Sequence, residues 1–422
     1  MGDVLSLLDI AALLLALSAG FGWLNLRFIG LPGSVGLLAM GLVSSLALVV
    51  VDLLVPEEPL HRGLIAAVGA IDFQSTVLDG LLAFLLFAGA LHLDIGKLRG
   101  RAWPIALMAT GGTLLSTFVI GLGLWAVAAP LGYPVPLAWA LVFGALICPT
   151  DPVAVLGTLK AVQVPPSIET DMAGESLFND GVGIVLFALL LTLAQGGAAG
   201  PAQAAELFLR EAVGGAALGA LTGWIAYRMT RAVDDYALEV LMSLALATGT
   251  YALAQALHSS GPLAVVVAGI LLGSHGAERG MSDRTRTYVF GFWDVVDQAL
   301  NAVLFLLIGL EVLLLRFDAT FAPFALAAVP LAIAGRFAAV GGAVALLGRF
   351  VPFARGTVAI LTWGGLRGGI SVALALSLPD IPEKPALLAA TYAVAVFSIL
   401  VQGSTLASVV RRVKPDAAAA GT

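Results

Sequence analysis

The chain has 422 residues, of which 60% are hydrophobic and only 11% are charged, and its mean hydropathy is +1.01. This is too little polar surface to cover a water-soluble globule of that size, so the composition predicts a polytopic membrane protein. A single cysteine, Cys148, excludes an intramolecular disulfide and any cysteine-based metal site. The net charge of −6 gives no indication of nucleic-acid binding.

Apolar segments long enough to span a bilayer follow one another along nearly the whole chain, and about thirteen are predicted. They lie near residues 5–26, 31–55, 73–95, 102–130, 136–159, 170–195, 206–230, 237–257, 262–275, 287–315, 320–348, 354–379 and 385–410. The first segment carries Asp3 and Asp9 and has no basic region before it, so we expect a span rather than a cleaved signal peptide. The predicted fold is therefore an all-α polytopic membrane protein.

The lysines and arginines divide unevenly between the two sets of loops. Of the 21, fifteen fall at the loops after odd-numbered segments and four at the others, while Arg336 and Arg367 lie well inside segments. Positive loops stay on the cytoplasmic side, so we expect the N-terminus outside and the C-terminus in the cytoplasm of a cell (inner) membrane. Residues 413–422 are expected to form a short disordered cytoplasmic tail.

The fifth segment contains the sequence Cys148-Pro149-Thr150-Asp151-Pro152, which interrupts its helix. Each proline lacks an N–H and clashes with the carbonyl four residues earlier, so the carbonyls of Ala145 and Cys148 should lose their partners. Residues before proline avoid the α region, so Cys148 and Asp151 should be extended, and a new helix should start at Pro152 with Asp151 as its cap. Irregular backbone at bilayer depth commonly carries an ion site.

The sixth segment opens with Gly174-Glu175-Ser176-Leu177-Phe178-Asn179-Asp180. Glu175 and Asn179 are four residues apart, as are Ser176 and Asp180, so the four polar side chains lie on adjoining faces of one helix. Carboxylates, hydroxyls and freed carbonyls are hard oxygen ligands that suit a small cation. A plainer alternative is that the two acids are only helix N-terminal charges.

The twelfth segment contains Thr362-Trp363-Gly364-Gly365-Leu366-Arg367-Gly368-Gly369-Ile370-Ser371, in which four glycines surround one arginine. Its plainer alternative is a small-residue packing face with a snorkelling arginine. If segments 1–6 and 8–13 are inverted repeats of six helices with segment 7 as linker, this interruption corresponds to the proline break. The sequence thus predicts two broken helices that cross at mid-membrane.

The charges inside segments leave one negative charge in excess, since Asp151, Glu175 and Asp180 face Arg336 and Arg367. One proton or one monovalent cation neutralises that excess, which is the basis of one-for-one exchange. We expect Asp180 to be the switching carboxylate, with Ser176, Thr150 and Asp151 as further cation ligands. Glu175 is expected to pair with Arg336, and Asn179 to donate to the freed carbonyls.

The remaining polar groups in the segments have simpler interpretations. Five acids at or near segment ends are expected to be solvated or locally paired, and they are Asp79, Asp94, Asp294, Asp297 and Glu311. No histidine joins a metal-ligand spacing, so neither a catalytic metal nor a cofactor is predicted.

Three motifs, PTDPVAV, GESLFNDGVGIVLF and GGLRGGIS, resemble in that order the sodium/proton exchanger family of monovalent cation:proton antiporters, particularly its bacterial NhaP-like members. The resemblance covers residues 10–412. It implies Asp180, Ser176, Thr150 and Asp151 at the cation site, a buried Glu175–Arg336 pair, and Asn179 as the asparagine that accompanies electroneutral exchange. Arg367 matches an arginine of the second broken helix.

The resemblance also implies a homodimer in which a mobile core carries the site across the membrane. The core would comprise residues 101–196 and 320–412, residues 1–100 and 237–315 would form a dimerisation domain, and 206–230 would be a linker helix. The predicted function is exchange of Na⁺ (alternatively Li⁺ or K⁺) for H⁺ by a secondary transporter, not an enzyme.

Four alternatives compete with that function. A K⁺-selective proton antiporter and a sodium-coupled solute symporter are the nearest in mechanism. A cation channel would need a repeated filter loop, and none is visible in the sequence. An intramembrane aspartyl protease would need glycine before its second aspartate, where Asn179 stands instead.

Overall fold

The computed structural model describes residues 7–54, 72–197, 201–277, 280–311 and 319–413, and every regular element in these ranges is a helix. An apolar chain in lipid has no water to bond its backbone, so it must pair its own N–H and C=O groups, as a helix does. Eight described helices are long and apolar enough to cross a membrane, and three shorter apolar helices accompany them. The predicted all-α, multi-span architecture is confirmed.

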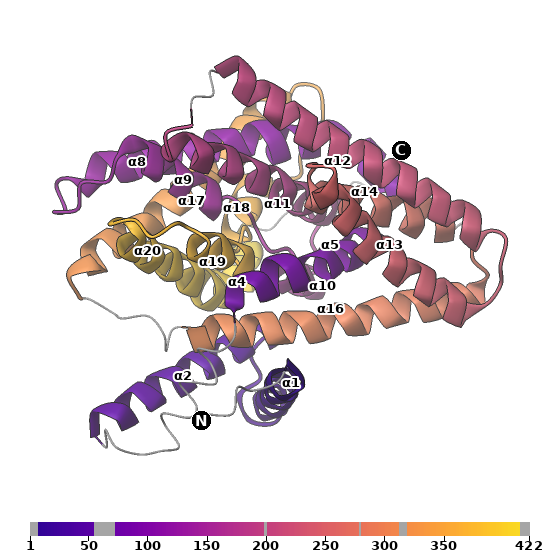
Figure 1. Ribbon diagram of the computed structural model, residues 1–422, viewed down its shortest axis with the longest axis horizontal. Coiled ribbons are helices and arrows are strands. Elements are labelled where there is room, and N and C mark those ends of the chain that lie inside the picture. The colour runs from indigo at the N-terminus through magenta and orange to yellow at the C-terminus, as the bar shows by residue number, and fades with distance from the viewer. Residues whose placement is uncertain (1–6, 55–71, 198–200, 278–279, 312–318, 414–422) are drawn as a thin grey trace.

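One layer is built around a single long helix that runs across the molecule (Figure 1). Its elements are α1 (Leu7–Leu24), η1 (Asn25–Ile29), α2 (Gly33–Leu54) and the long helix α16 (Asp283–Glu311). Small residues let α2 and α16 approach closely, since a Cβ at Gly309 would lie 2.8 Å from the backbone nitrogen of Leu42. The Ser45 hydroxyl donates to the Gly309 carbonyl at 2.8 Å across the same contact.

A second group of helices packs on α16 around Trp293 and Phe87, whose ring centroids are 4.7 Å apart. It comprises α4 (Phe73–Ser75), η2 (Thr76–Leu81), α5 (Leu82–Leu91), α12 (Pro201–Thr230), α13 (Tyr236–Ala256), α14 (Gly261–Leu271) and η4 (Leu272–Gly276). The Trp293 indole N–H donates to the Ser243 hydroxyl at 2.8 Å, so the buried ring has its polar partner. With α1, α2 and α16, these helices are called the scaffold below.

The remaining helices gather on the other side of the molecule and are called the core below (Figure 1). They are α7 (Ala102–Leu107), η3 (Met108–Gly112), α8 (Thr113–Ala128), α9 (Leu137–Ile147), α10 (Val153–Ala161), α11 (Pro166–Ala194), η5 (Ala319–Phe321), α17 (Ala322–Leu347), α18 (Thr357–Trp363), α19 (Gly369–Leu376), α20 (Lys384–Phe397), η6 (Ser398–Gly403) and α21 (Ser404–Val413), and the short helix α6 (Ile95–Gly100) leads into α7. Phe143 and Phe324 lie fully buried in the cluster that joins α8, α9, α17 and α20.

The thirteen predicted segments all overlap described helices. Segments 136–159 and 354–379 are each a pair of short helices, α9 with α10 and α18 with α19, separated by irregular backbone. The predicted ends at 55 and 312–315 lie outside the described residues, as do 414–422 of the predicted tail. The number of membrane crossings, the inverted repeats and the domain boundaries stay predictions.

Candidate ion-binding site

The break between α9 and α10 begins at Cys148, which follows the last residue of α9. Cys148 keeps α-helical dihedrals, with φ −69° and ψ −36°, so the prediction that it would be extended is wrong. Its N–H donates to the Ala145 carbonyl at 3.1 Å, so the carbonyl of Ala145 is not left unpaired either. The tight final turn compensates for the bond that Pro149 cannot make. Helix α10 begins at Val153 and Pro152 precedes it, one residue later than predicted.

The carbonyls that the proline break leaves without a helical partner accept hydrogen bonds from Arg367. Its Nη1 donates to the Cys148 carbonyl and, at 3.3 Å, to the Pro149 carbonyl. The side chain is 3% exposed, and the backbone N–H of Arg367 donates to the Ser398 hydroxyl at 2.9 Å. A buried guanidinium needs several acceptors, and the proline break supplies two of them.

The two broken helices meet directly through their backbones. The N–H of Asp151 donates to the carbonyl of Leu366 at 2.8 Å. Gly368 makes this approach possible, because a Cβ there would lie 3.0 Å from the Cβ of Asp151. A Cβ at Gly365 would instead lie 2.5 Å from Nε of Arg336 on α17. The irregular stretch of each helix is therefore held by the other.

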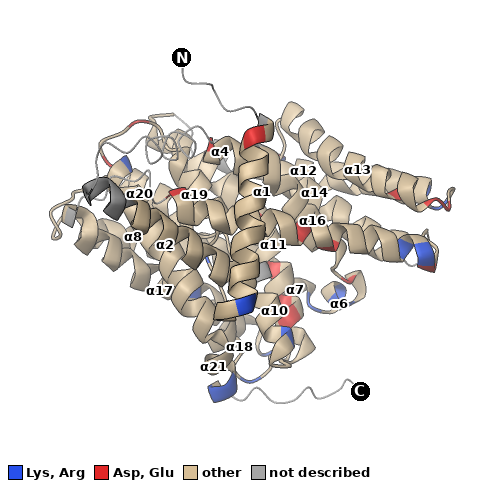
Figure 2. Cartoon of the chain, turned by 90° about the horizontal axis from the view of Figure 1, so that it is seen from below, with Lys and Arg blue, Asp and Glu red and all other residues tan. Residues whose placement is uncertain are grey.

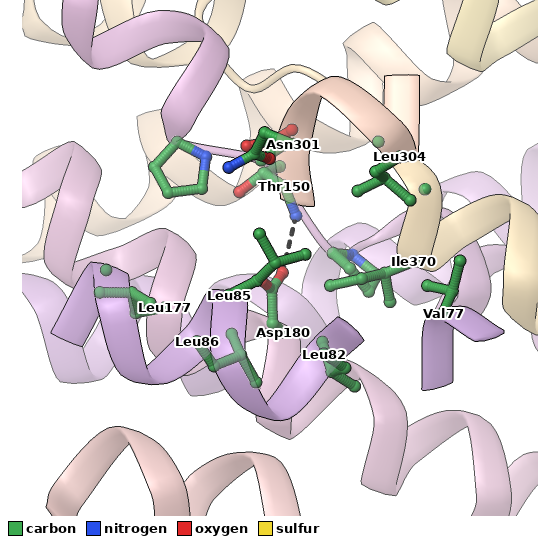
Figure 3. Close-up of a pocket in the computed structure, with 16 residues that line it drawn as sticks. Val77, Leu82, Leu85, Leu86, Thr150, Leu177, Asp180, Asn301, Leu304 and Ile370 are labelled. Atoms are coloured by element: carbon green, nitrogen blue, oxygen red, sulfur yellow. Dashed lines mark hydrogen bonds between the residues drawn. The ribbon is translucent and has the colours of Figure 1, made fainter. Parts of the chain in front are cut away.

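The first break lies against the polar face of α11 (Figure 3). The N–H of Thr150 donates to Oδ1 of Asp180 at 3.1 Å and lies 3.3 Å from Oδ1 of Asn179, and the hydroxyls of Thr150 and Ser176 are 3.0 Å apart. All four side chains are 3% exposed or less. The structure thus brings Thr150 of the proline break together with Ser176, Asn179 and Asp180, which the spacing predicts to lie on adjoining faces of one helix.

Glu175 and Arg336 form a buried ion pair beside this cluster. Both carboxylate oxygens accept from the guanidinium, with Arg336 Nη2 to Glu175 Oε2 at 2.6 Å, and Arg336 Nε also donates to the Leu361 carbonyl at 3.2 Å. Asn179 Nδ2 donates to Glu175 Oε1 at 2.7 Å and to the Thr150 hydroxyl at 2.9 Å. The prediction that Asn179 would donate to freed carbonyls is wrong, because Arg367 takes the carbonyls of the break.

A cavity of about 50 Å³ opens beside Asp180 and Asp151. Residues 149–152, Leu177, Asp180 and residues 368–370 line it from the core, and scaffold residues such as Leu82 and Leu304 complete the lining (Figure 3). Roughly 10–15 Å³ of such cavity space holds one water molecule, so there is room for a small cation together with a few waters. Carboxylate, hydroxyl and carbonyl oxygens are the ligands that such a cation prefers.

A second ion pair within the core was missed from the sequence. Arg101 donates through Nε to Asp171 Oδ1 at 2.8 Å and through Nη2 to Asp171 Oδ2, and its guanidinium lies 4.8 Å from the centre of the Phe353 ring. Arg101 is one of the fifteen basic residues that the sequence places in loops. The available signal was the position of Asp171, one helical turn before Glu175 on the same face of α11.

Three of the five acids near segment ends have local partners in the described structure, whereas Glu311 is buried and forms no ion pair with a described residue. Asp94 caps α6 by accepting from the N–H of Gly96 at 2.7 Å, Asp294 lies 3.1 Å from His92, and Asp297 accepts from Asn301. The side chain of Asp79 lies outside the described part of the structure. Asn301 was not considered from the sequence, yet it lines the cavity beside Asp180.

Residues 13–412 match the family described as the transmembrane sodium/hydrogen exchangers. The chain belongs to the sodium/hydrogen exchanger family. This exchanger is 46% identical to the Na⁺/H⁺ antiporter NhaP of Pseudomonas aeruginosa, an alignment that covers 96% of this chain and 97% of that protein. It is 38% identical to the Na⁺/H⁺ antiporter NhaH of Halobacillus aidingensis over 81% of this chain and 83% of that protein.

Among solved structures, the exchanger resembles the sodium proton antiporter MjNhaP1 of Methanocaldococcus jannaschii, with a TM-score of 0.73 over 96% of this chain and 98% of that one. The two are 20% identical, so the likeness shows a common fold. The predicted resemblance to the family is confirmed, and membership makes the exchanger a secondary transporter rather than an enzyme.

Proposed function

We propose that this exchanger moves one Na⁺ in exchange for one H⁺ across the membrane, by alternating access of the site at Asp180. The names of its relatives in Pseudomonas and Halobacillus support Na⁺ as the cation. The cycle needs only the cation and the proton, so no cofactor enters it. A preference for Li⁺ or K⁺ over Na⁺ would change the substrate and leave the mechanism intact.

One observation carries the proposal, namely that Asp180 is buried without an ion-pair partner among the described residues. Glu175 is neutralised by Arg336, and Asp171 by Arg101. Arg367 donates to the carbonyls of the proline break, so the charge of Asp180 has no ion-pair partner among the described residues. A buried charge of that kind is costly unless a cation or a proton neutralises it.

Competition between the two neutralising species produces the exchange. A cation at Asp180 leaves no net charge for a proton to neutralise, and a proton on the carboxylate removes the ligand that holds the cation. Asp180, Ser176, Thr150 and Asp151 are assigned as cation ligands. Glu175, Arg336, Asn179 and Arg367 are assigned supporting roles, because each is fully engaged with protein partners.

Alternating access would move the core against the scaffold. The cavity at Asp180 lies between the two, with the ion-binding residues on the core wall and mostly apolar side chains opposite. Apolar scaffold side chains make no hydrogen bonds to the ion-binding residues, so no such bonds must break when the core moves against the scaffold. We assign residues 101–196 and 320–412 to the moving core, 1–100 and 237–315 to a dimerisation domain of a homodimer, and 206–230 to a linker.

The orientation follows from the distribution of basic residues. Figure 2 shows blue lysines and arginines near α6, α10 and α21, and another at the lower end of the helix labelled α1, on the same side. By the positive-inside rule this side is cytoplasmic, which leaves the N-terminus outside and the C-terminus in the cytoplasm of the cell (inner) membrane. A sodium-coupled symporter is less well supported, because the described lining of the cavity at Asp180 is mostly apolar and offers an organic substrate few polar groups beyond those of the ion site.

The test is a proton-flux assay in proteoliposomes, in which Na⁺, Li⁺ or K⁺ dissipates a trapped pH gradient. We expect Na⁺ to dissipate the gradient at the same rate with the membrane potential clamped or free. Failure of all three cations would overturn the antiporter, and a rate that follows the potential would overturn the one-for-one ratio. A response to K⁺ alone would replace Na⁺ by K⁺ as the substrate.

A further inference from the structure

Helix α16 carries a polar pair, Asp297 and Asn301, one turn apart on one face. Nδ2 of Asn301 donates to the backbone carbonyl of Asp297 at 2.9 Å and to its carboxylate Oδ1 at 3.0 Å. Both partners are acceptors, so they determine which end of the amide is nitrogen. Oδ1 of Asn301 accepts no hydrogen bond from any residue that the structure describes, although the side chain is only 7% exposed.

Asn301 lines two cavities, one of which is the cavity at Asp180. A second cavity, of about 740 Å³, is lined by Gly157, Thr158, Gln298 and Arg411 among others. Of the described residues, only Asn301 lines both this cavity and the smaller one at Asp180. We call the larger cavity the vestibule. Asn301 therefore lies at the boundary between the vestibule and the ion-binding site.

The wall opposite the ion-binding site is otherwise apolar. Among the described scaffold residues around the smaller cavity, Asn301 alone has a polar side chain, and the other scaffold residues in the lining include Leu85, Leu86 and Leu304 (Figure 3). A cation that leaves the vestibule must exchange water for protein oxygens in steps, and a carbonyl oxygen is a suitable hard ligand. The carboxylate of Asp297 adds negative charge one turn away, which attracts cations to this point.

We propose that Asn301, oriented by Asp297, is a transfer ligand that coordinates the cation between the vestibule and Asp180. This inference rests on the proposed cation exchange. Asn301 belongs to the scaffold, so it meets the moving site in only one of its two positions. The vestibule contains Arg411 and adjoins the basic side of the protein, so that position is the one open to the cytoplasm. Asn301 thus sets the apparent affinity for the cation on the cytoplasmic face alone.

The experiment measures the apparent KM for Na⁺ from each face in proteoliposomes of defined orientation. For Asn301→Ala we expect KM at the cytoplasmic face to rise roughly tenfold, as for the loss of one ligand. The KM at the other face and the maximal rate should stay as in the wild type. Asp297→Asn should shift KM in the same direction by less. Gln298→Ala is the matched control, since Gln298 lines only the larger cavity.

Three outcomes separate the possibilities. A KM unchanged at the cytoplasmic face, or raised equally at both faces, would overturn the transfer ligand. A fall in maximal rate together with a lower melting temperature would show a structural role and overturn it too. If the wild-type exchanger itself moves no protons in response to a cation, the proposed function fails, which is a distinct result from any of these.

Discussion

The backbone N–H of Asp151 donates to the carbonyl of Leu366 at 2.8 Å, and this bond joins the backbones of the two broken helices at their irregular centres. Arg367, the next residue, donates back to the carbonyls of Cys148 and Pro149. The two breaks therefore satisfy each other's backbone, which allows non-helical chain to persist inside an apolar protein. Thr150, between the two prolines, is free to direct its N–H at Asp180.

Replacing Asp180 by asparagine should abolish exchange without unfolding the protein. The amide has nearly the same size and can still accept from Thr150, but it neither ionises nor neutralises a cation. We expect cation-driven proton flux to fall to background, with the melting temperature and gel-filtration profile of the wild type. Asp94→Asn is the control, because Asp94 only caps α6 and asparagine is an equally good cap. Normal flux by the Asp180 variant would contradict the assignment.

Breaking the Glu175–Arg336 pair should be strongly destabilising. Either Glu175→Gln or Arg336→Ala leaves an uncompensated buried charge, and such changes cost about 3–5 kcal/mol. Thermal unfolding in detergent is the measurement. The double variant Glu175→Gln/Arg336→Met, which removes both charges, should lose less stability than the two single variants added together. Unchanged melting temperatures in both single variants would refute the role of the pair.

A methyl group at Gly365 should disturb the second break. Its Cβ would lie 2.5 Å from Nε of Arg336, and Glu175 and the Leu361 carbonyl hold that guanidinium in place. We expect Gly365→Ala to lose about 1–3 kcal/mol, as in other overpacked sites, and to slow transport. Gly249→Ala on α13 has no atom within 4 Å of its new Cβ and should be neutral or slightly stabilising. Equal melting temperatures for the two variants would count against the contact.

Proton and cation should compete at one site. As the pH falls, the apparent KM for Na⁺ should rise by up to about tenfold per pH unit, the limit for one competing proton. The maximal rate at saturating Na⁺ should change much less over the same range. The measurement is a series of Na⁺ titrations with equal pH on both sides of the proteoliposome membrane. A KM independent of pH, with a maximal rate that falls on acidification, would indicate separate sites.

The sequence by itself determined the membrane class, the helical segments, both breaks and the polar face of α11. These features are local, because proline chemistry, apolar run length and the four-residue spacing act within a few residues along the chain. The motifs also sufficed to indicate the family. Two local predictions were wrong, because Cys148 kept its helical turn by a bond to the Ala145 carbonyl and Asn179 donated to Glu175 and Thr150 rather than to freed carbonyls.

Only the tertiary structure decided which groups meet across the fold. The bond from Arg367 to the Cys148 carbonyl joins residues 219 positions apart, and the pair of Arg101 with Asp171 joins residues 70 apart. The place of Asn301 between two cavities likewise depends on how α16 packs against the core. Spacing along one helix determines which side chains share a face, whereas the partner of that face is set by helix packing, which no local pattern encodes.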